Sequence, residues 1–483
     1  MNQTKRAANG SLSVKDAIVA VLAERQRPMH YSEIARIAQS RAGRLRGATP
    51  EQTVNATLTT NLDVFVRVSR GVYALANWSV EQQAAVSNST RLEQLTCWGF
   101  RSYPSREVAQ PLDMTRLTVL IGPNSSGKSN LLDLLLLISE AADQRLTAGV
   151  TRRNGMRSIL WQNGADEFGW ELVLAPEGAF ASEDAPLHYR VVVQRRGEVP
   201  FIIEEEAALH RNGSRHVLLH AVNGSARFRS PGKTRLGPET PLASSSELAI
   251  AQIRDPQTYP TLSRLREYLA SWAIYREFLT DEQSKMRQPQ VASAETQLQP
   301  HGENLIAVLH QISNRTLYQP YYTTIQNWLS LAFDDFERLY FPAEPGASGK
   351  IGLAWKDRSL SGDLDVSQLS DGMLRFLALA TLFAAPDLPP LLCVDEPEIG
   401  LHPALLHLVA GFAEKAAART QVILTTHSAQ LVSNVSRPEY VTVVERDGGA
   451  TTLRRLQSEN LAAWLREFTL GDLWLQGEIG GRP

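Results

Sequence analysis

The pattern of hydrophobic and polar residues divides the chain into a short helical region and a longer region of alternating strands and helices. In the first region, apolar residues recur at helical spacing in "SVKDAIVAVLAE", "YSEIARIAQ" and "TPEQTVNATLTTNL", and "FVRVSRGVYAL" alternates around an Arg70-Gly71 turn. These spacings predict three helices followed by a β-hairpin. Such elements make a winged helix, which we place at residues 1–78, with the polar segment 79–90 as a linker.

Residues 91–483 form the longer region, and their pattern predicts an α/β domain. The run "RLTVLIG" is apolar and β-branched, as a buried strand is, and "SNLLDLLLLI" has the composition of a buried helix. Alternating segments over 168–230, such as "LHYRVVVQRRG", predict an antiparallel β lobe. Helical periodicity over 255–340, in "TLSRLREYLASWAIYREFL", "ENLIAVLHQISN" and "TTIQNWLSLAFDDFERLYF", predicts a helical insert.

Composition indicates the cellular environment of the protein more clearly than its function. Cys97 and Cys393 are the only cysteines, too few for a disulfide framework or a thiolate zinc site, so we expect a reducing, cytoplasmic environment. No apolar run reaches the roughly 20 residues that a membrane span needs. The N-terminus also lacks the apolar core of a secretion signal, and we expect no membrane partner.

Charge is unevenly distributed, although the formal net charge of the whole chain is only −2. Residues 1–78 contain 11 Lys and Arg against 5 Asp and Glu, a net charge of +6, which leaves −8 for the other residues. A small basic domain points to an anionic partner, and we expect that partner to be double-stranded DNA.

A phosphate-binding motif follows the first strand of the longer region. "GPNSSGKS" satisfies the pattern G-x-x-x-x-G-K-[ST] in the strand, loop, helix context that the motif requires. Backbone N–H groups of such a loop bind the phosphates of ATP, Lys128 supplies positive charge, and the Ser129 hydroxyl is a ligand for Mg²⁺. The nucleotide-binding candidates are Gly122, Pro123, Asn124, Ser125, Ser126, Gly127, Lys128, Ser129 and Asn130.

The stretch "PPLLCVDEPEIG" places three carboxylates after an apolar strand. Asp395, at the strand end, is the candidate Mg²⁺ ligand together with Ser129. Glu396 follows immediately, so its side chain points away from the metal, and we predict that it orients and polarises the attacking water. Glu398 is predicted to make a loop contact. The alternative is that these carboxylates only solvate a loop, which the neighbouring phosphate-binding motif disfavours.

Two stretches between residues 360 and 440 resemble motifs of ATP-binding-cassette ATPases. "VSQLSDGMLRFLALATLF" resembles their signature motif, with Asp371 where transporters have glycine, and "QVILTTHSAQLV" resembles the strand before their switch histidine, here His427. The resemblance implies that Ser370 and Gly372 bind the γ-phosphate of an ATP held by a second subunit, head to tail. Taken singly, "LSDG" is also compatible with an ordinary helix cap and His427 with a core histidine.

The motifs together resemble the RecF/SMC-related predicted ATPases, which include the ATPase halves of overcoming-lysogenization-defect proteins and many anti-phage systems. "LTVLIGPNSSGKSNLLD", "VDEPEIGLHP", "TTHSAQLV" and the tail "LGDLWLQGEIGG" carry this resemblance with the signature. It implies a P-loop fold of ABC-ATPase type, ATP and Mg²⁺ as cofactors, an ATP-dependent homodimer, and Lys128, Glu396 and His427 as catalytic residues. Only 56 residues follow His427, so we expect no nuclease domain after it.

The N-terminal region resembles the HARE-type helix-turn-helix family, through "PMHYSEIA", "GATPEQTVNATL" and "FVRVSRGVYAL". The resemblance implies that the third helix contacts duplex DNA. It makes Asn55, Thr57 and Thr59 candidates for base edges, and Arg44, Arg46, Arg67 and Arg70 candidates for phosphates. Winged helices also bind proteins, so a protein partner is the alternative.

Two other stretches give weaker signals. "FIIEEEAALH" is predicted to be a solvated strand end at Glu204, Glu205 and Glu206, with a metal or partner role as the less favoured alternative. In the tail, Trp474 and Leu475 have an exposed pattern; local packing is the favoured role, and docking of a partner or a second subunit is the alternative.

Three functions are consistent with these features. The first is a DNA-associated ATPase whose ATP-dependent dimer controls engagement of DNA or of an effector, in anti-phage defence or DNA repair. The second is an ATP-gated scaffold that regulates a separate nuclease or toxin with little turnover of its own. The third is an ATP-responsive transcription regulator.

Overall fold

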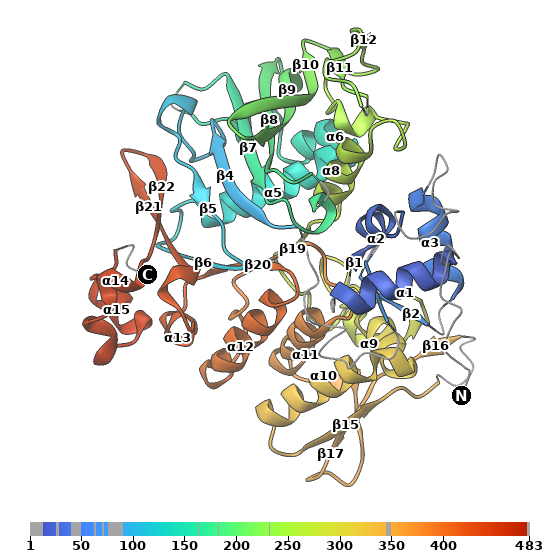
Figure 1. Cartoon of the computed structure of the whole chain (residues 1–483). Coiled ribbons are helices and arrows are strands. Elements are labelled where there is room, and N and C mark those ends of the chain that lie inside the picture. The colour runs from blue at the N-terminus through green and yellow to red at the C-terminus, as the bar shows by residue number, and fades with distance from the viewer. Residues whose placement is uncertain are drawn as a thin grey trace, which may run out of the picture. The chain divides into compact units, whose positions relative to one another are not determined.

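The computed structural model describes residues 13–25, 29–39, 50–61, 64–69, 72–75, 90–162, 164–181, 183–230, 232–343 and 349–480. The chain divides into two units. The first comprises residues 1–89 with the segment 177–182, and the second comprises residues 90–176 and 183–483. Figure 1 labels the elements of both.

The first unit is a winged helix, which confirms the prediction for this region. The apolar face of its first helix, formed by Ala17, Ile18, Val21 and Leu22, is fully buried. The strand β1 is not predicted by the sequence, because two residues are too few to show a pattern. The turn Arg70-Gly71 and linker residues 79–89 lie outside the described residues. The elements are α1 (Val14–Arg25), β1 (Met29–His30), α2 (Tyr31–Ala38), α3 (Pro50–Thr60), β2 (Phe65–Ser69) and β3 (Val72–Leu75), with sheet order β1-β3-β2.

A six-stranded sheet forms the centre of the second unit. Its order is β13 (Ala273–Tyr275), β19 (Leu391–Asp395), β20 (Gln421–Thr426), β6 (Leu117–Ile121), β21 (Val441–Asp447) and β22 (Ala450–Arg455). All neighbours are parallel except β21 and β22. Every residue of β6 is buried, because helices cover both faces. Figure 1 shows α5 (Lys128–Ala142) on one face and α11 (Asp371–Ala384), α12 (Leu406–Ala417) and α13 (Ala429–Ser433) on the other.

An eight-stranded antiparallel sheet forms the β lobe, on the α5 side of the central sheet (Figure 1). The predicted alternation over 168–230 appears as β7 to β11, but the sheet also takes in β4 and β5, which precede it in sequence. The Gln421 side chain joins the two sheets, because it bonds both the N–H and the carbonyl of Leu92 at 2.9 Å. The order is β12 (Thr240–Pro241), β11 (Ser225–Phe228), β10 (Ser214–Val222), β9 (Val199–Arg211), β8 (Leu187–Arg196), β7 (Glu167–Leu174), β4 (Leu92–Trp98) and β5 (Leu112–Asp113).

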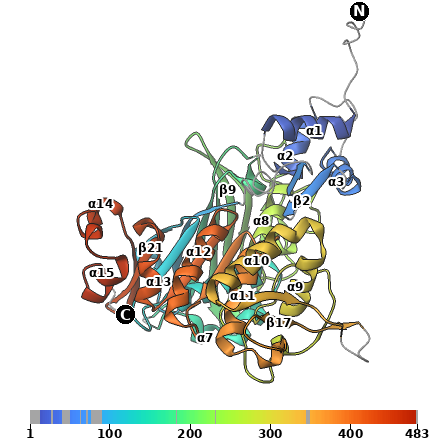
Figure 2. The same cartoon turned by 90° about the horizontal axis from the view of Figure 1, so that it is seen from below.

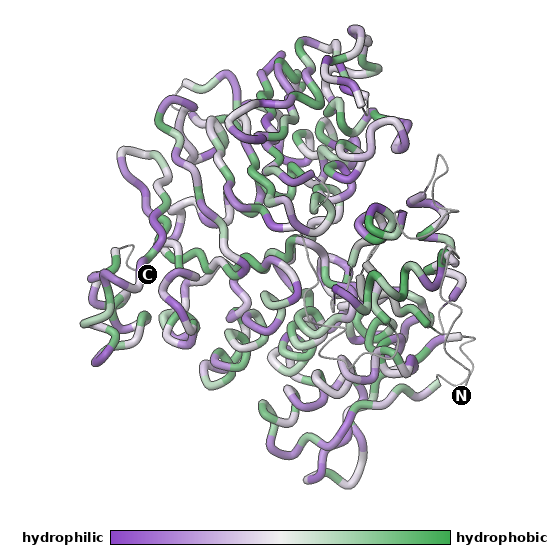
Figure 3. The backbone as a smooth tube through the Cα atoms, viewed as in Figure 1, coloured by the Kyte–Doolittle hydropathy of each residue, from purple (hydrophilic) through white to green (hydrophobic). Residues whose placement is uncertain are grey.

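The insert contains three helices, α8 (Pro260–Ala270), α9 (Leu305–Asn314) and α10 (Gln319–Ala332). The expectation of continuous helix through "SWAIYREFL" is wrong, because 273–275 pair with β19 as β13 at the edge of the central sheet. The end of "TTIQNWLSLAFDDFERLYF" is also a strand, β15 (Phe336–Tyr340), which pairs with β17 (Ala354–Asp357). Figure 2 shows α9, α10, α11 and α12 side by side, and Figure 3 shows hydrophobic stretches along them.

The C-terminal tail packs on the same face as α13. Trp474 is fully buried in α15 (Leu470–Gln476), in agreement with the favoured role of local packing, whereas Leu475 is exposed. A Cβ at Gly471 would lie 2.0 Å from the carbonyl oxygen of Ala429, so glycine permits the close contact of α15 with α13. No helix among the described residues has the length and apolar character of a membrane span. The remaining short elements are α6 (Leu146–Arg152), α7 (Met156–Ile159), β14 (Gln290–Val291), β16 (Lys350–Ile351), β18 (Leu364–Asp365) and α14 (Ser458–Leu461).

Candidate nucleotide-binding site

The phosphate-binding loop connects β6 to α5, and its two framing glycines have backbone conformations that side chains rarely adopt. Gly122 has a φ of +149°, and a Cβ there would lie 2.0 Å from the carbonyl oxygen of Val444. Gly127 has a φ of +117°, and a Cβ would lie 2.2 Å from the Thr451 Oγ1 atom. Glycine is therefore required at both positions for the loop to close over α5.

Lys128 is folded back into this loop. Its Nζ atom donates to the carbonyl oxygens of Gly122 at 2.8 Å and Pro123 at 3.1 Å, and the residue is only 3% exposed. Burial lowers the pKa of Lys128 to about 8, although Glu396, Asp395 and Glu398 oppose this shift. A buried ammonium held by carbonyls at the start of a helix gains from an added anion, as a phosphate would supply.

The other loop residues differ in exposure and in their contacts with neighbouring segments. Asn124, Ser125 and Ser129 are exposed, and Ser126 is buried. The Asn130 Nδ2 atom donates to Ser102 Oγ at 2.8 Å, so this amide faces the loop before β5.

Three residues that the sequence analysis did not select hold the loop in place. Thr451 of β22 donates to the carbonyl oxygen of Ser126 at 2.7 Å, and its Oγ1 atom lies 2.8 Å from Ser102 Oγ. The Tyr103 hydroxyl donates to the carbonyl oxygen of Gly127 at 3.2 Å. Ser102 and Tyr103 lie in the stretch "FRSY", which has no recognisable motif. Thr451 comes from a strand over 300 residues away in sequence, so it has no local signal.

The acidic strand β19 ends two strands from the phosphate-binding loop, with β20 between β19 and β6. Asp395 lies opposite Thr425 in the β19–β20 register and accepts a hydrogen bond from its hydroxyl. The carboxylate of Asp395 and the hydroxyl of Ser129 are both hard oxygen ligands, which is the donor chemistry that Mg²⁺ prefers. This donor set fits the predicted metal.

Glu396 and His427 face one another at the ends of β19 and β20. The Glu396 backbone is left-handed, with a φ of +46°, and its N–H donates to the Thr425 carbonyl oxygen at 3.1 Å. Its Oε1 atom lies 3.5 Å from the Nε2 atom of His427. Burial and the positive charge of Lys128 lower the pKa of His427, which favours a neutral imidazole at neutral pH.

Glu398 turns back toward β20. Its Oε1 atom accepts from the hydroxyl of Thr426 at 2.6 Å and from the backbone N–H of His427 at 2.8 Å. Burial raises the pKa of this carboxyl. The predicted loop contact is therefore present, and it fixes the backbone of the histidine that faces Glu396.

The signature residues begin α11. Ser370 is its N-cap and accepts from the N–H of Met373 at 3.3 Å, and Gly372 lies in the first turn. Arg287, which the sequence analysis did not select, donates to the carbonyl oxygen of Leu369 and to Asp371, both at 2.6 Å. The helices α11 and α5, which follow the signature and the phosphate-binding loop respectively, cover opposite faces of the central sheet (Figure 1).

The third helix of the winged helix has an exposed face formed by Gln52, Thr53, Ala56, Thr59 and Thr60. Of the predicted base-edge residues, only Thr59 lies on it. The Asn55 Oδ1 atom accepts from the Tyr73 hydroxyl at 3.2 Å, and Thr57 donates to the Thr53 carbonyl oxygen at 2.8 Å. Arg44, Arg46 and Arg70 lie outside the described residues, as does the side chain of Arg67.

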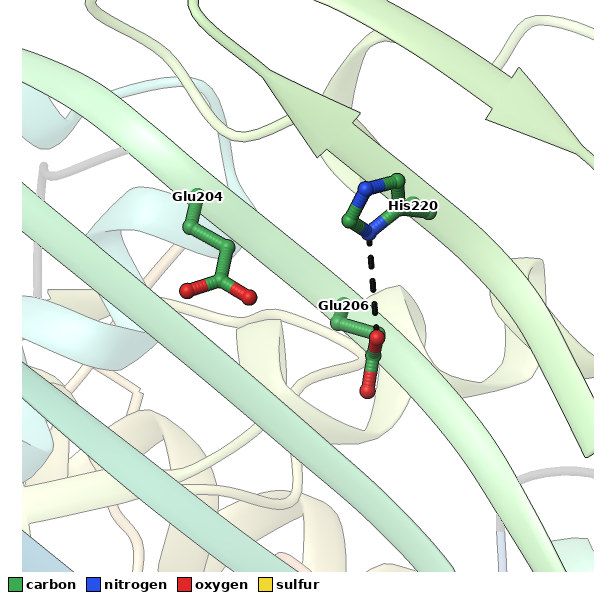
Figure 4. Close-up of side chains that lie close together, drawn as sticks. All are labelled: Glu204, Glu206 and His220. Carbon is green, nitrogen blue, oxygen red and sulfur yellow. Dashed lines mark ion pairs between the residues drawn. The ribbon is translucent and has the colours of Figure 1, made fainter. Parts of the chain in front are cut away.

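The expectation of a solvated strand end at Glu204, Glu205 and Glu206 is wrong, because these residues lie in the middle of β9. Glu205 is fully buried and Glu206 is 8% exposed. Figure 4 shows Glu204, Glu206 and His220 on one face of the lobe. The two carboxylates already pair with Arg190 and Arg215, respectively. These arginines therefore already supply positive charge to the two carboxylates.

The second unit has a P-loop fold, with the phosphate-binding loop between β6 and α5 of a mostly parallel sheet, and a winged helix precedes it in sequence. Residues 117–433 match the family described as "AAA domain, putative AbiEii toxin, Type IV TA system", and the chain belongs to this family. Residues 12–78 match the HARE-HTH family, whose description includes "restriction endonuclease HTH domain". Among curated proteins, no sequence match was found.

Several solved structures are similar in fold. The Smc head bound to the C-winged helix domain of ScpA is 16% identical, with a TM-score of 0.46, over 77% of this chain and 99% of that chain. The Smc head with an extended coiled coil from Pyrococcus furiosus, bound to the C-terminal domain of ScpA, is 14% identical, with a TM-score of 0.47, over 78% and 99%. The SMC head domain from Thermotoga maritima is 17% identical, with a TM-score of 0.41, over 76% and 99%.

Proposed function

We propose that this protein is a DNA-associated ATPase that binds and hydrolyses ATP between two copies of its ATPase unit. The observation that carries the proposal is the cluster of Lys128, Asp395, Glu396 and His427, which come from three separate strand ends and meet at one edge of the sheet. A cation for the phosphates, a metal ligand, a carboxylate and a neutral histidine are the groups that phosphoryl transfer to water needs.

Each residue has a distinct role in this proposal. Lys128 exchanges its two loop carbonyls for phosphate oxygens, and Ser129 and Asp395 hold Mg²⁺, which neutralises phosphate charge when bound. Glu396 orients the attacking water and accepts its proton. His427 donates a hydrogen bond from Nε2 toward the γ-phosphate, and Glu398 keeps its backbone in position.

The opposite placement of α5 and α11 supports a site shared between two subunits. Ser370 and the N–H of Gly372 then bind the γ-phosphate of the ATP held by the partner, as a helix N-terminus binds an anion. ATP closes the dimer and hydrolysis reopens it. The basic winged helix supplies the contact to double-stranded DNA, and the movement changes the grip on DNA or on a separate effector nuclease or toxin. We place this activity in the cytoplasm, in anti-phage defence or DNA repair.

The test compares wild type with Glu396→Gln, with and without duplex DNA. We expect wild type to hydrolyse ATP faster with DNA, and the variant to bind ATP, lose about 100-fold or more of its turnover and accumulate as a dimer. The exposed residue Glu459 supplies a matched control, because Glu459→Gln removes one carboxylate outside the site. Full turnover by Glu396→Gln contradicts the proposed role. Dimerisation on ATP without turnover in wild type favours the ATP-gated scaffold.

A further inference from the structure

The β lobe contains a cavity of about 500 Å³ that is separate from the phosphate-binding loop. It lies between the β9–β10 hairpin, residues 229–230 and 232–234, and the first turn of α8. All the residues that line it belong to the second unit. Its volume is within the usual range of small-molecule sites.

Positive charge dominates the lining of this cavity. Arg211, Arg229 and Lys233 contribute three cations, and Glu183 contributes one carboxylate. Burial and the positive charge of the neighbouring Arg211 lower the pKa of Arg229, although Glu183 opposes this shift. Within the described part of the chain, no hydrogen bond from the Arg229 side chain is present. An anion between the two arginines would relieve this repulsion.

Glu183 offsets only part of this positive charge, because its closest ion pair is with Arg264. Its Oε1 atom accepts from Arg264 Nη2 at 2.7 Å and from the Thr261 hydroxyl at 2.5 Å. The side chains of Glu183 and Arg264 are only 12% and 13% exposed. The Arg211 Nη2 atom lies 3.7 Å from Glu183 Oε2, and its Nε atom donates to the Glu183 carbonyl oxygen at 3.0 Å, which leaves Nη1 of Arg211 without a hydrogen bond to Glu183. The cavity therefore keeps a net positive charge.

Two further features suit a ligand that is anionic at one end and organic at the other. The N-terminus of α8 lines the cavity at Pro260 and Thr261 and has no side-chain cap, so the helix adds positive potential. Tyr259 lines the cavity beside them, with its ring 5.2 Å from that of Phe228. Leu209 and Leu218 add apolar surface. Together they provide a wall for a sugar or a base.

We propose that this cavity binds a phosphate monoester of nucleotide size, with the phosphate between Arg211 and Arg229 and the organic part against Tyr259. Paired arginines match phosphate oxygens better than lysines do, because each guanidinium donates two parallel hydrogen bonds. A free mononucleotide and the 5′-phosphate at the end of a DNA strand share this chemistry. The proposed site is distinct from the ATP site, and it gives the ATPase unit a second phosphate-binding position.

The test is calorimetric titration of the full chain with thymidine 5′-monophosphate, with thymidine as the uncharged probe. We expect the monophosphate to bind and thymidine not to bind. Arg229→Ala should weaken binding by about tenfold or more, and Arg229→Lys by less. Arg227→Ala is the matched control, because Arg227 pairs with Glu239 at 3.2 Å outside the cavity and should change binding by less than about twofold. Lys128→Ala should bind the monophosphate as wild type does.

A second arm compares oligonucleotides with a 5′-phosphate and a 5′-hydroxyl. A preference for the 5′-phosphate that Arg229→Ala removes identifies the ligand as a DNA end, whereas binding of the mononucleotide alone identifies a free metabolite, and either result supports the site. The proposal is overturned if the monophosphate does not bind, or if Lys128→Ala abolishes binding while a folded Arg229→Ala retains it.

Discussion

Glu205 makes the stability of the β lobe depend on pH in a way that can be measured. The carboxylate is fully buried in β9. It accepts hydrogen bonds from the N–H groups of Ala249 and Ile250, at 2.5 and 3.0 Å, and from the Tyr189 hydroxyl at 3.0 Å. These bonds stabilise the ionised form, but burial outweighs them and raises the pKa to about 7 from the usual 4.5.

The sign of the effect follows from proton binding. Between the two pKa values the folded state keeps the proton that the unfolded chain has released, so this contribution to stability is complete below about pH 4.5 and is lost as the pH rises through about 7. Between pH 5 and pH 8 the expected loss in the free energy of unfolding is about 2–3 kcal/mol. No discount for solvent screening applies, because the carboxyl is fully buried.

Glu205→Gln removes the titration, so the assay is the difference in the free energy of unfolding between wild type and variant, from urea transitions at pH 5 and pH 8. We expect wild type to lose about 2–3 kcal/mol relative to the variant over this range. Glu459→Gln, at an exposed position, controls for the removal of one carboxylate. A difference that stays constant with pH within about 0.5 kcal/mol refutes the reasoning.

Three substitutions test the nucleotide site. Gly122→Ala should abolish ATP binding in calorimetry, because the new Cβ would lie 2.0 Å from the Val444 carbonyl oxygen; ATP affinity near the wild-type value would contradict the loop geometry. Glu398→Ala should lower kcat by about 10- to 100-fold with ATP affinity retained, because His427 loses its backbone anchor, and an unchanged kcat would exclude this role. Arg287→Ala should weaken ATP-dependent dimerisation by about tenfold in sedimentation, since it releases the signature loop, and an unchanged dimer would argue against a shared site.

The elements predicted correctly are those whose signal is local. The phosphate-binding motif joins a strand to a helix within one short stretch, and the buried face of α1 follows helical spacing. Asp395 and Glu396 stand at a strand end because the apolar run before them stops there. Placement of this kind can be predicted from sequence, because neighbouring residues carry the whole pattern.

The features that the sequence did not reveal depend on distant partners. The strand β13 looks helical, and only its pairing with β19 makes it a strand. The sequence around Glu205 suggests a solvated residue because its neighbours are acidic. In the structure it is buried and accepts hydrogen bonds from the N–H groups of residues more than 40 positions away. The close approach of α15 to α13, which Gly471 permits, also depends on residues that are distant in sequence. Tertiary contacts of this type leave no local pattern.

The central claim is that each ATP site combines Lys128 of one subunit with Ser370 of its partner. The most direct measurement is the ATPase activity of a mixture of two variants, Lys128→Ala and Ser370→Arg, each inactive alone. In a mixed dimer, the Ser370→Arg subunit supplies an intact phosphate-binding loop and the Lys128→Ala subunit supplies an intact signature, so one site is complete. Random pairing should then restore about a quarter of the wild-type rate. The contrary result is a mixture that stays inactive although both variants are folded and form mixed dimers. In that case the phosphate-binding loop and the signature of different subunits do not form one ATP site, and the proposal of a shared site is wrong.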